Sequence, residues 1–146
     1  MSDLTDFYSD IIMEHSAHSH NRHEMPDETC SAHGHNPNCG DDITLHIKYI
    51  DGKIADLSFT GDGCAISQSS TSVMIDLLKG KTKQEALALI DIFIDMIDRK
   101  PISKEQEKML KEAMAFQNVQ NMPARVKCAL LAWKTLKQKI MEWISY

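Results

Sequence analysis

The sequence predicts an α+β fold in which a small antiparallel β-sheet of about three strands packs against several α-helices. Two observations lead to this prediction. Apolar residues alternate over residues 43–50 and 53–59, the period of half-buried strands, and the intervening Asp51-Gly52 is a typical hairpin turn. After residue 64 the apolar spacing becomes helical and stays so. Strands followed by a run of helices are typical of α+β domains.

The N-terminal residues 3–15 have apolar side chains at helical spacing, namely Leu4, Tyr8, Ile11 and Ile12, and predict a helix. Residues 16–38 are rich in His, Asn, Pro, Ser and Gly, so they are expected to form a His-rich loop. A third strand could lie within this stretch before Cys39, but no alternation marks it. The first recognisable strand therefore begins at Ile43.

The two strands of the predicted hairpin should turn alternate residues to the core. These are Ile43, Leu45, Ile47 and Tyr49 on the first strand and Ala55, Leu57 and Phe59 on the second.

Four further helices are predicted after the hairpin. The first covers 64–80 and ends at a glycine, and the next two open with capping boxes, Thr82 with Glu85 and Ser103 with Gln106. The last begins near Pro123. Its apolar stripe is Val126, Ala129, Leu130, Trp133, Leu136, Ile140 and Trp143.

The chain of 146 residues is expected to be one domain, 1–146. A formal net charge of −5 gives no electrostatic reason to bind nucleic acid or an anionic membrane. The acidic N-terminus is unlike a secretory signal, and no apolar run is long enough to span a membrane. We therefore expect a cytoplasmic protein whose thiols remain reduced.

The four cysteines, at positions 30, 39, 64 and 128, include no CxxC pair. Cys39 precedes a strand, Cys64 stands at the mouth of a helix, and Cys128 lies early in the last helix. Helix N-termini stabilise thiolates, which are the metal-binding and attacking form of cysteine. The alternative is that these cysteines are buried core residues, which is common for free Cys.

Asp41 lies two residues after Cys39, so in an extended chain both side chains point to the same side. Together with Cys64 and Cys128 they would form a set of three thiolates and one carboxylate. Such a set suits zinc and disfavours magnesium or calcium. Arg125 and Lys127 flank this set on the last helix, where their charges could balance an anionic metal centre.

Three blocks of the chain, "NPNCGDDITL", "GDGCAISQSSTSVM" and "MPARVKCALLAW", together resemble the SufU/IscU/NifU N-terminal family of iron–sulfur cluster assembly proteins. The resemblance implies the fold predicted above. It also implies a metal site of Cys39, Asp41, Cys64 and Cys128, with Arg125 close to the metal. Lys127 stands where IscU-type scaffolds carry a histidine, and an insertion at roughly 81–115 lengthens the chain between Cys64 and Cys128. Both features are similar to the SufU type.

The SufU-type resemblance implies a function: a zinc-dependent sulfurtransferase that accepts persulfide sulfur from a cysteine desulfurase of the SufS type and passes it to the downstream cluster-assembly machinery. It assigns the acceptor role to Cys39, with a histidine of the desulfurase replacing it on zinc. The alternative is an IscU-like scaffold on which a [2Fe–2S] cluster is assembled, with iron or the cluster in place of zinc. A third hypothesis is a zinc-stabilised adaptor that only activates the desulfurase, so the sequence does not decide whether the protein is an enzyme.

The remaining polar clusters are interpreted more simply. Six of the seven histidines lie between residues 15 and 35, and we interpret them as part of a polar loop rather than a second metal site. Cys30 has no counterpart in the family and is expected to be an exposed thiol open to oxidation. The hydroxyl residues from Ser67 to Ser72 favour close helix packing over nucleophilic catalysis, since no partner base is visible.

Overall fold

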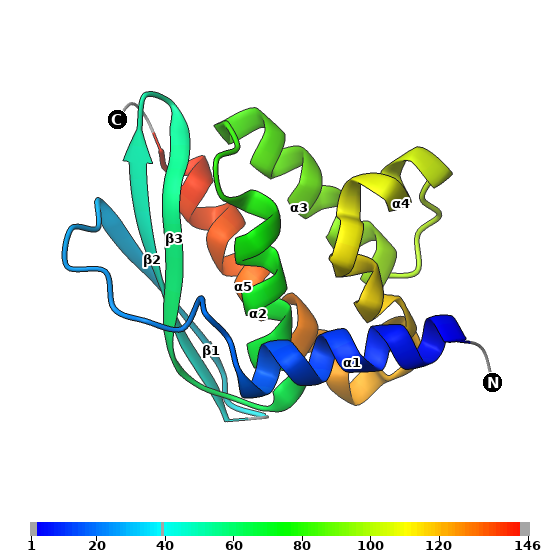
Figure 1. Cartoon of the computed structure of the whole chain (residues 1–146). Helices are drawn as coiled ribbons and strands as arrows, with labels where there is room; N and C mark the ends of the chain where they lie inside the picture. The colour runs from blue at the N-terminus through cyan, green and yellow to red at the C-terminus, as the bar shows by residue number, and fades with distance from the viewer. Residues whose placement is uncertain (1–2, 39, 144–146) are drawn as a thin grey trace.

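The structure is a computed structural model that describes residues 3–38 and 40–143, with side chains from residue 9 onward. It consists of a three-stranded antiparallel sheet and helices (Figure 1). The strands β1 (Cys30–Asn36), β2 (Asp41–Ile50) and β3 (Lys53–Asp62) lie side by side in chain order. This confirms the predicted fold class.

The β2–β3 hairpin turns at Asp51 and Gly52, which have φ values of 53° and 77°. Positive φ at both turn residues is the geometry whose twist matches the flanking strands. The inward alternation of β2 is confirmed, with Ile43, Leu45, Ile47 and Tyr49 buried.

One residue of β3 departs from the expected alternation. Lys48 pairs with Asp56 whereas Tyr49 pairs with Ile54, so Ala55 is an extra residue in a β-bulge. Ala55 is therefore exposed, and Ile54 takes the core position that the sequence pattern assigned to Ala55.

The stretch expected as a loop over residues 16–38 contains β1, which pairs with β2 from Cys30 opposite Ile47 to Asn36 opposite Asp41. Its sequence, CSAHGHN, lacks the apolar alternation that marks a strand. Before β1, residues 21–29 pass beside the sheet (Figure 1). Glu28 contacts His46, whose position on β2 alternates with the core residues Leu45 and Ile47. The strand forms because β2 supplies hydrogen-bonding partners, a tertiary effect that local composition does not show.

Five α-helices and one 3₁₀ helix accompany the sheet. They are α1 (Asp3–Ala17), α2 (Ala65–Leu78), α3 (Lys83–Ile97), α4 (Lys104–Leu110), the 3₁₀ helix η1 (Lys111–Asn121) and α5 (Pro123–Met141). Helices α2 and α5 pack against the sheet and each other, whereas α1 runs across α2 and η1 (Figure 1). Both predicted capping boxes are present, at Thr82 and Ser103.

The helix predicted over residues 103–116 is interrupted. Lys111 has φ of 49°, and α4 ends there as η1 begins. The four consecutive residues 113–116 are all buried, which a single face of an α-helix does not allow. Packing of η1 against the core therefore overrides the helical pattern of the sequence.

The core is centred on Trp133 of α5, whose ring stacks on Phe93 of α3 with centroids 3.8 Å apart. Phe116 of η1 meets the same Phe93 ring edge-on. Trp143 stacks on Tyr49 of β2 at 3.9 Å, which joins the end of the chain to the sheet. The stretch from 81 to 115 thus contributes to the same hydrophobic cluster as the sheet. Within the described residues, none of the helices combines the length and apolar character that a membrane span requires.

Candidate metal centre

Three of the four predicted ligands meet where β2 begins and where α2 and α5 pass close to it. A carboxylate oxygen of Asp41 and the Sγ atoms of Cys64 and Cys128 all lie within 4.8 Å of one another. Neighbouring ligands on a tetrahedral zinc ion are about 3.5–4 Å apart. The three side chains therefore need to contract only slightly to share an ion.

Asp41, the first residue of β2, is fully buried. Its Oδ1 atom accepts a hydrogen bond of 2.9 Å from the backbone N–H of Cys64. Its Oδ2 atom is also buried and has no hydrogen-bond partner among the described residues. A buried carboxylate oxygen without a donor is costly, and a bound cation would remove that cost.

Cys64 is the N-cap residue of α2, with extended backbone angles and a side chain that accepts from the N–H of Ser67. The Sγ–N distance is 3.4 Å. The positive end of the helix dipole and this N–H group both direct partial positive charge at the Cys64 sulfur. The capping role thus holds this sulfur toward the centre, where a metal could bind it.

Gly63 permits the close approach of β3, α2 and Asp41. A Cβ atom at this position would lie 2.7 Å from Asp41 Oδ1 and 3.2 Å from Ser67 Oγ. Real Cβ atoms do not approach oxygen that closely, so any larger residue would displace the Asp41 carboxylate. Gly63, the second glycine of "GDGC", is therefore explained by the geometry of the centre rather than by a turn.

Cys128 lies early in α5 and is 1% exposed. The side-chain amide of Asn36, the last residue of β1, donates to Cys128 Sγ over 3.9 Å. Sequence reasoning missed Asn36, although it is the first residue of the quoted block "NPNCGDDITL". Asn36 could have been identified only from its position in β1, and the sequence pattern did not reveal that strand.

Cys39, the fourth predicted ligand and the predicted sulfur acceptor, lies outside the described residues. The short connection that contains it joins Asn36 to Asp41, which face each other in the β1–β2 register. Both ends of this connection are thus anchored at the centre, by Asn36 through Cys128 and by Asp41 through Cys64.

Arg125 and Lys127 are both exposed at the start of α5. Lys127 also lines a surface groove of about 600 Å³ between residues 35–38 and α5. The other lining residues are His35, Asn36, Pro37, Asn38, Asp98, Val126, Leu130, Leu131, Lys134, Thr135 and Gln138. This groove borders residues 35–38, which precede Cys39 in the chain.

Cys30 lies away from this centre, and its exposure differs from the prediction. It is half-buried at the start of β1, beside Tyr49, Lys139, Glu142 and Trp143. This burial is the main cause that raises the pKa of the Cys30 thiol. The expectation that the Cys30 thiol is exposed is wrong, because β1 pairs with β2 and places Cys30 beside Tyr49 and Trp143.

Comparison with known proteins shows the relationships of the chain. Residues 7–129 match the family described as "NifU-like N terminal domain". The chain is 40% identical over 140 residues to the iron–sulfur cluster assembly scaffold protein IscU of Streptococcus pyogenes serotype M1, covering 96% of this chain and 86% of that protein. It is 37% identical over 140 residues to the zinc-dependent sulfurtransferase SufU of Bacillus subtilis, covering 95% of this chain and 92% of that protein.

A solved structure shows the same arrangement. The putative iron–sulfur cluster assembly scaffold protein for the SUF system from Fervidobacterium islandicum AW-1 superimposes with a TM-score of 0.84 at 40% identity, covering 94% of this chain and 98% of that one. The arrangement of strands and helices described above is therefore shared with a protein of this type.

Proposed function

The chain belongs to the family of NifU-like N-terminal domains, and from this membership we propose that it is a zinc-dependent sulfurtransferase of iron–sulfur cluster assembly. The observation that carries the proposal is the meeting of Asp41, Cys64 and Cys128, two of them buried and Cys64 partly so, in one centre. The similarity to the Bacillus subtilis sulfurtransferase over nearly the whole of both chains supports it. We place the activity in the cytoplasm, where thiols remain reduced.

The donor set fits zinc. Cys64 and Cys128 provide two sulfurs, the unpartnered Oδ2 of Asp41 provides an oxygen, and Cys39 provides the fourth ligand. Sulfur ligands select zinc over magnesium or calcium. When bound, zinc keeps these thiols deprotonated at neutral pH and so supplies a ready thiolate. Arg125 and Lys127, at the start of α5, would offset part of the negative charge of this donor set.

The proposed substrate is a cysteine persulfide on a cysteine desulfurase of the SufS type. The Cys39 thiolate attacks the outer, sulfane sulfur of the persulfide, so that a new S–S bond forms on Cys39. The bond between the two sulfurs of the desulfurase breaks, and its cysteine leaves as a thiolate. The groove between residues 35–38 and α5 offers space for the segment that carries the persulfide.

Cys39 is suited to the acceptor role because the other ligands are held in place. Cys64 caps a helix and Cys128 is buried in one, whereas Cys39 belongs to the connection between two strands. Asp41 is fixed by its bond to the Cys64 backbone.

A second candidate function is that of a scaffold for a [2Fe–2S] cluster, because the Streptococcus pyogenes relative carries that name. The three cysteines are suitable cluster ligands. Lys127 supports the sulfurtransferase, because it stands where the resemblance implies a histidine in IscU-type scaffolds. Lys127 is exposed and cannot serve as a cluster ligand in its protonated form.

The test is sulfur transfer from ³⁵S-cysteine with a purified SufS-type desulfurase. We expect labelled persulfide on the wild-type protein and on Cys30→Ala, and none on Cys39→Ala. Desulfurase turnover should also fail to rise with Cys39→Ala. If Cys39→Ala still stimulated the desulfurase fully, the protein would be an adaptor and the acceptor proposal would be wrong. The Cys30→Ala control removes a thiol remote from the centre.

A further inference from the structure

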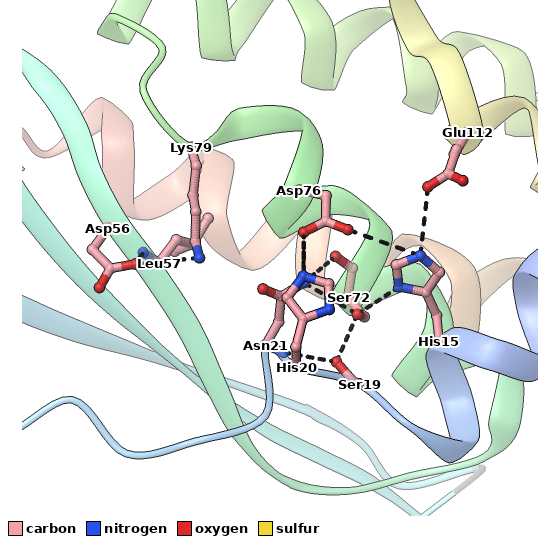
Figure 2. Close-up of polar contacts among 10 residues, drawn as sticks. All are labelled: His15, Ser19, His20, Asn21, Asp56, Leu57, Ser72, Asp76, Lys79 and Glu112. Atoms are coloured by element: carbon pink, nitrogen blue, oxygen red, sulfur yellow. Dashed lines mark hydrogen bonds and ion pairs between the residues drawn. The ribbon is translucent and has the colours of Figure 1, made fainter.

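A second group of metal-binding side chains lies where α1, α2 and η1 meet (Figure 2). His15 comes from the end of α1, Asp76 from α2 and Glu112 from η1. One ligand atom from each lies within 4.8 Å of the others. Asp76 follows Cys64 by twelve residues of α2, which separates this group from the cysteine centre by roughly 18 Å along the helix.

The distances within this group suit a shared ion. His15 Nε2 lies 3.5 Å from Glu112 Oε1 and 3.9 Å from Asp76 Oδ2. Both distances exceed the ~2.7–3.2 Å of a good N–H···O hydrogen bond. They are close to the roughly 3–3.6 Å that separates neighbouring ligands around an ion with bonds of about 2.0–2.2 Å.

The imidazole of His15 is held in the orientation that a metal ligand needs. Its side chain is only 11% exposed, and its Nδ1 atom lies 2.7 Å from the buried Ser72 hydroxyl. Ser72 Oγ also accepts from Asn21 Nδ2 at 3.2 Å and lies 2.7 Å from Ser19 Oγ. If Nδ1–H donates to Ser72, the Ser72 hydroxyl can donate to Ser19. The Nε2 lone pair then faces the two carboxylates.

Asp76 is oriented in a similar way. Its Oδ1 atom accepts from Asn21 Nδ2 at 2.9 Å and lies 3.0 Å from His20 Nε2. Asn21 is fully buried and also donates to the Ser72 carbonyl, so this support is fixed to the helix that carries Asp76. The other carboxylate oxygen of Asp76, Oδ2, points toward His15, as Figure 2 shows. Polar groups that orient ligand side chains by hydrogen bonds in this way are typical of metal sites in proteins.

We propose that His15, Asp76 and Glu112 form a second binding site for a divalent transition metal of the zinc class, completed by water. One imidazole and two carboxylates, without sulfur, form a donor set suited to such ions. The side chains of Asp76 and Glu112 are 34% and 52% exposed, which gives the ion a path from solvent. Because the three ligands come from three segments, a bound ion ties α1 to α2 and η1.

The competing explanation needs no metal. A protonated His15 would form ion pairs with both carboxylates at the same positions. The two explanations differ in what happens when a metal is added to the protein after the metal content of the cysteine centre has been measured. Only the proposed site takes up a further equivalent through Asp76 and Glu112.

The test is a calorimetric titration of the purified, metal-containing protein with Zn²⁺, together with its variants Glu112→Gln and Asp76→Asn. These exchanges keep the size of each side chain and remove its charge. Glu105→Gln, at an exposed position of α4, is the matched control. We expect one further equivalent to bind the wild type and the control, with affinity at least about tenfold weaker in both site variants. No further uptake by the wild type, or equal uptake by all four proteins, would overturn the proposal.

Cobalt identifies which site is filled. Co²⁺ added to the metal-containing protein should bind without the intense near-ultraviolet absorption of thiolate-to-cobalt charge transfer, because the proposed site has no sulfur. The bound ion should also raise the melting temperature of the wild type and not that of Glu112→Gln. Strong charge-transfer bands would show that the ion had entered the cysteine centre instead, which would contradict the proposal.

Discussion

Asp41 uses its two carboxylate oxygens in different ways. Oδ1 accepts a hydrogen bond from the Cys64 N–H, whereas Oδ2 is buried with no partner in the described part of the chain. The first contact fixes the orientation of the carboxylate. The second oxygen is left without a hydrogen bond, which is unfavourable for a buried polar atom unless a cation binds it.

We predict that Asp41→Asn keeps the fold but weakens zinc binding by at least roughly tenfold. The amide retains an oxygen to accept from Cys64 and loses the negative charge at the metal. Competition with a chromophoric chelator measures the affinity. The matched control is Asp42→Asn, because Asp42 is the exposed next residue and contacts His33 at 2.6 Å. Equal affinity in Asp41→Asn and wild type would exclude Asp41 as a ligand.

Cys30 leads to a prediction about reactivity. Burial raises the pKa of its thiol, so at a given pH the folded protein holds less of it as thiolate than an unfolded chain does. We expect Cys30 to react more slowly with iodoacetamide in the native protein than in urea, with its rate rising at higher pH. Peptide mapping of the alkylated protein follows this residue alone. Identical pH profiles for the native and urea-treated samples would refute the prediction.

The meeting of Asp41, Cys64 and Cys128 was predictable because each of these candidate ligands lies beside a strand or helix signal that is local in the sequence. Asn36 and Ser67 were not identified as partners of the centre. Asn36 contacts Cys128 only because β1 folds beside α5, and the Ser67 contribution is a backbone N–H that any residue would supply. The burial of Cys30 depends on the same unpredicted strand.

At the scale of elements, the hydroxyl residues of α2 let it approach α5 closely. Ser70 Oγ donates to the Ala129 carbonyl at 2.7 Å and accepts from Trp133 Nε1 at 2.8 Å. All of these groups are buried. Because Cys64 caps α2 and Cys128 lies in α5, the contact also sets the relative position of two candidate metal ligands.

We predict that Ser70→Ala lowers the free energy of unfolding by about 1–3 kcal/mol, since it leaves the indole N–H of Trp133 buried without an acceptor. Ser69→Ala is the matched control, because Ser69 is equally buried but bonds only to carbonyls of its own helix. The decrease in the free energy of unfolding caused by Ser69→Ala should be clearly smaller. Urea unfolding of both variants in the presence of zinc provides the comparison, and equal losses would show that the interhelical bonds contribute nothing.

The elements that sequence predicted well are those with local signals. The hairpin turn at Asp51-Gly52 and the capping boxes at Thr82 and Ser103 each depend on residues within a few positions of one another. The strand β1 and the 3₁₀ helix η1 depend on partners far along the chain. Their sequences therefore contain too little information to identify them without the rest of the fold.

At the scale of the whole molecule, the sheet and the helices place the candidate centre at one end of the fold. The start of β2, the end of β3 and the early part of α5 meet there, so candidate ligands distant in sequence lie close together. The stretch 81–115 lies apart from these ligands and packs through Phe93 against Trp133. It thereby supports the helix that carries Cys128 without contributing a ligand of its own.

The most direct test is the metal and acid-labile sulfide content of protein purified anaerobically without added metal or chelator. We predict about one equivalent of zinc per chain and no sulfide in the wild type and in Cys30→Ser, and loss of that zinc in Cys128→Ser. Iron with matching sulfide would instead make the protein a cluster scaffold. Zinc retained in full by Cys128→Ser would contradict the metal centre of Asp41, Cys64 and Cys128.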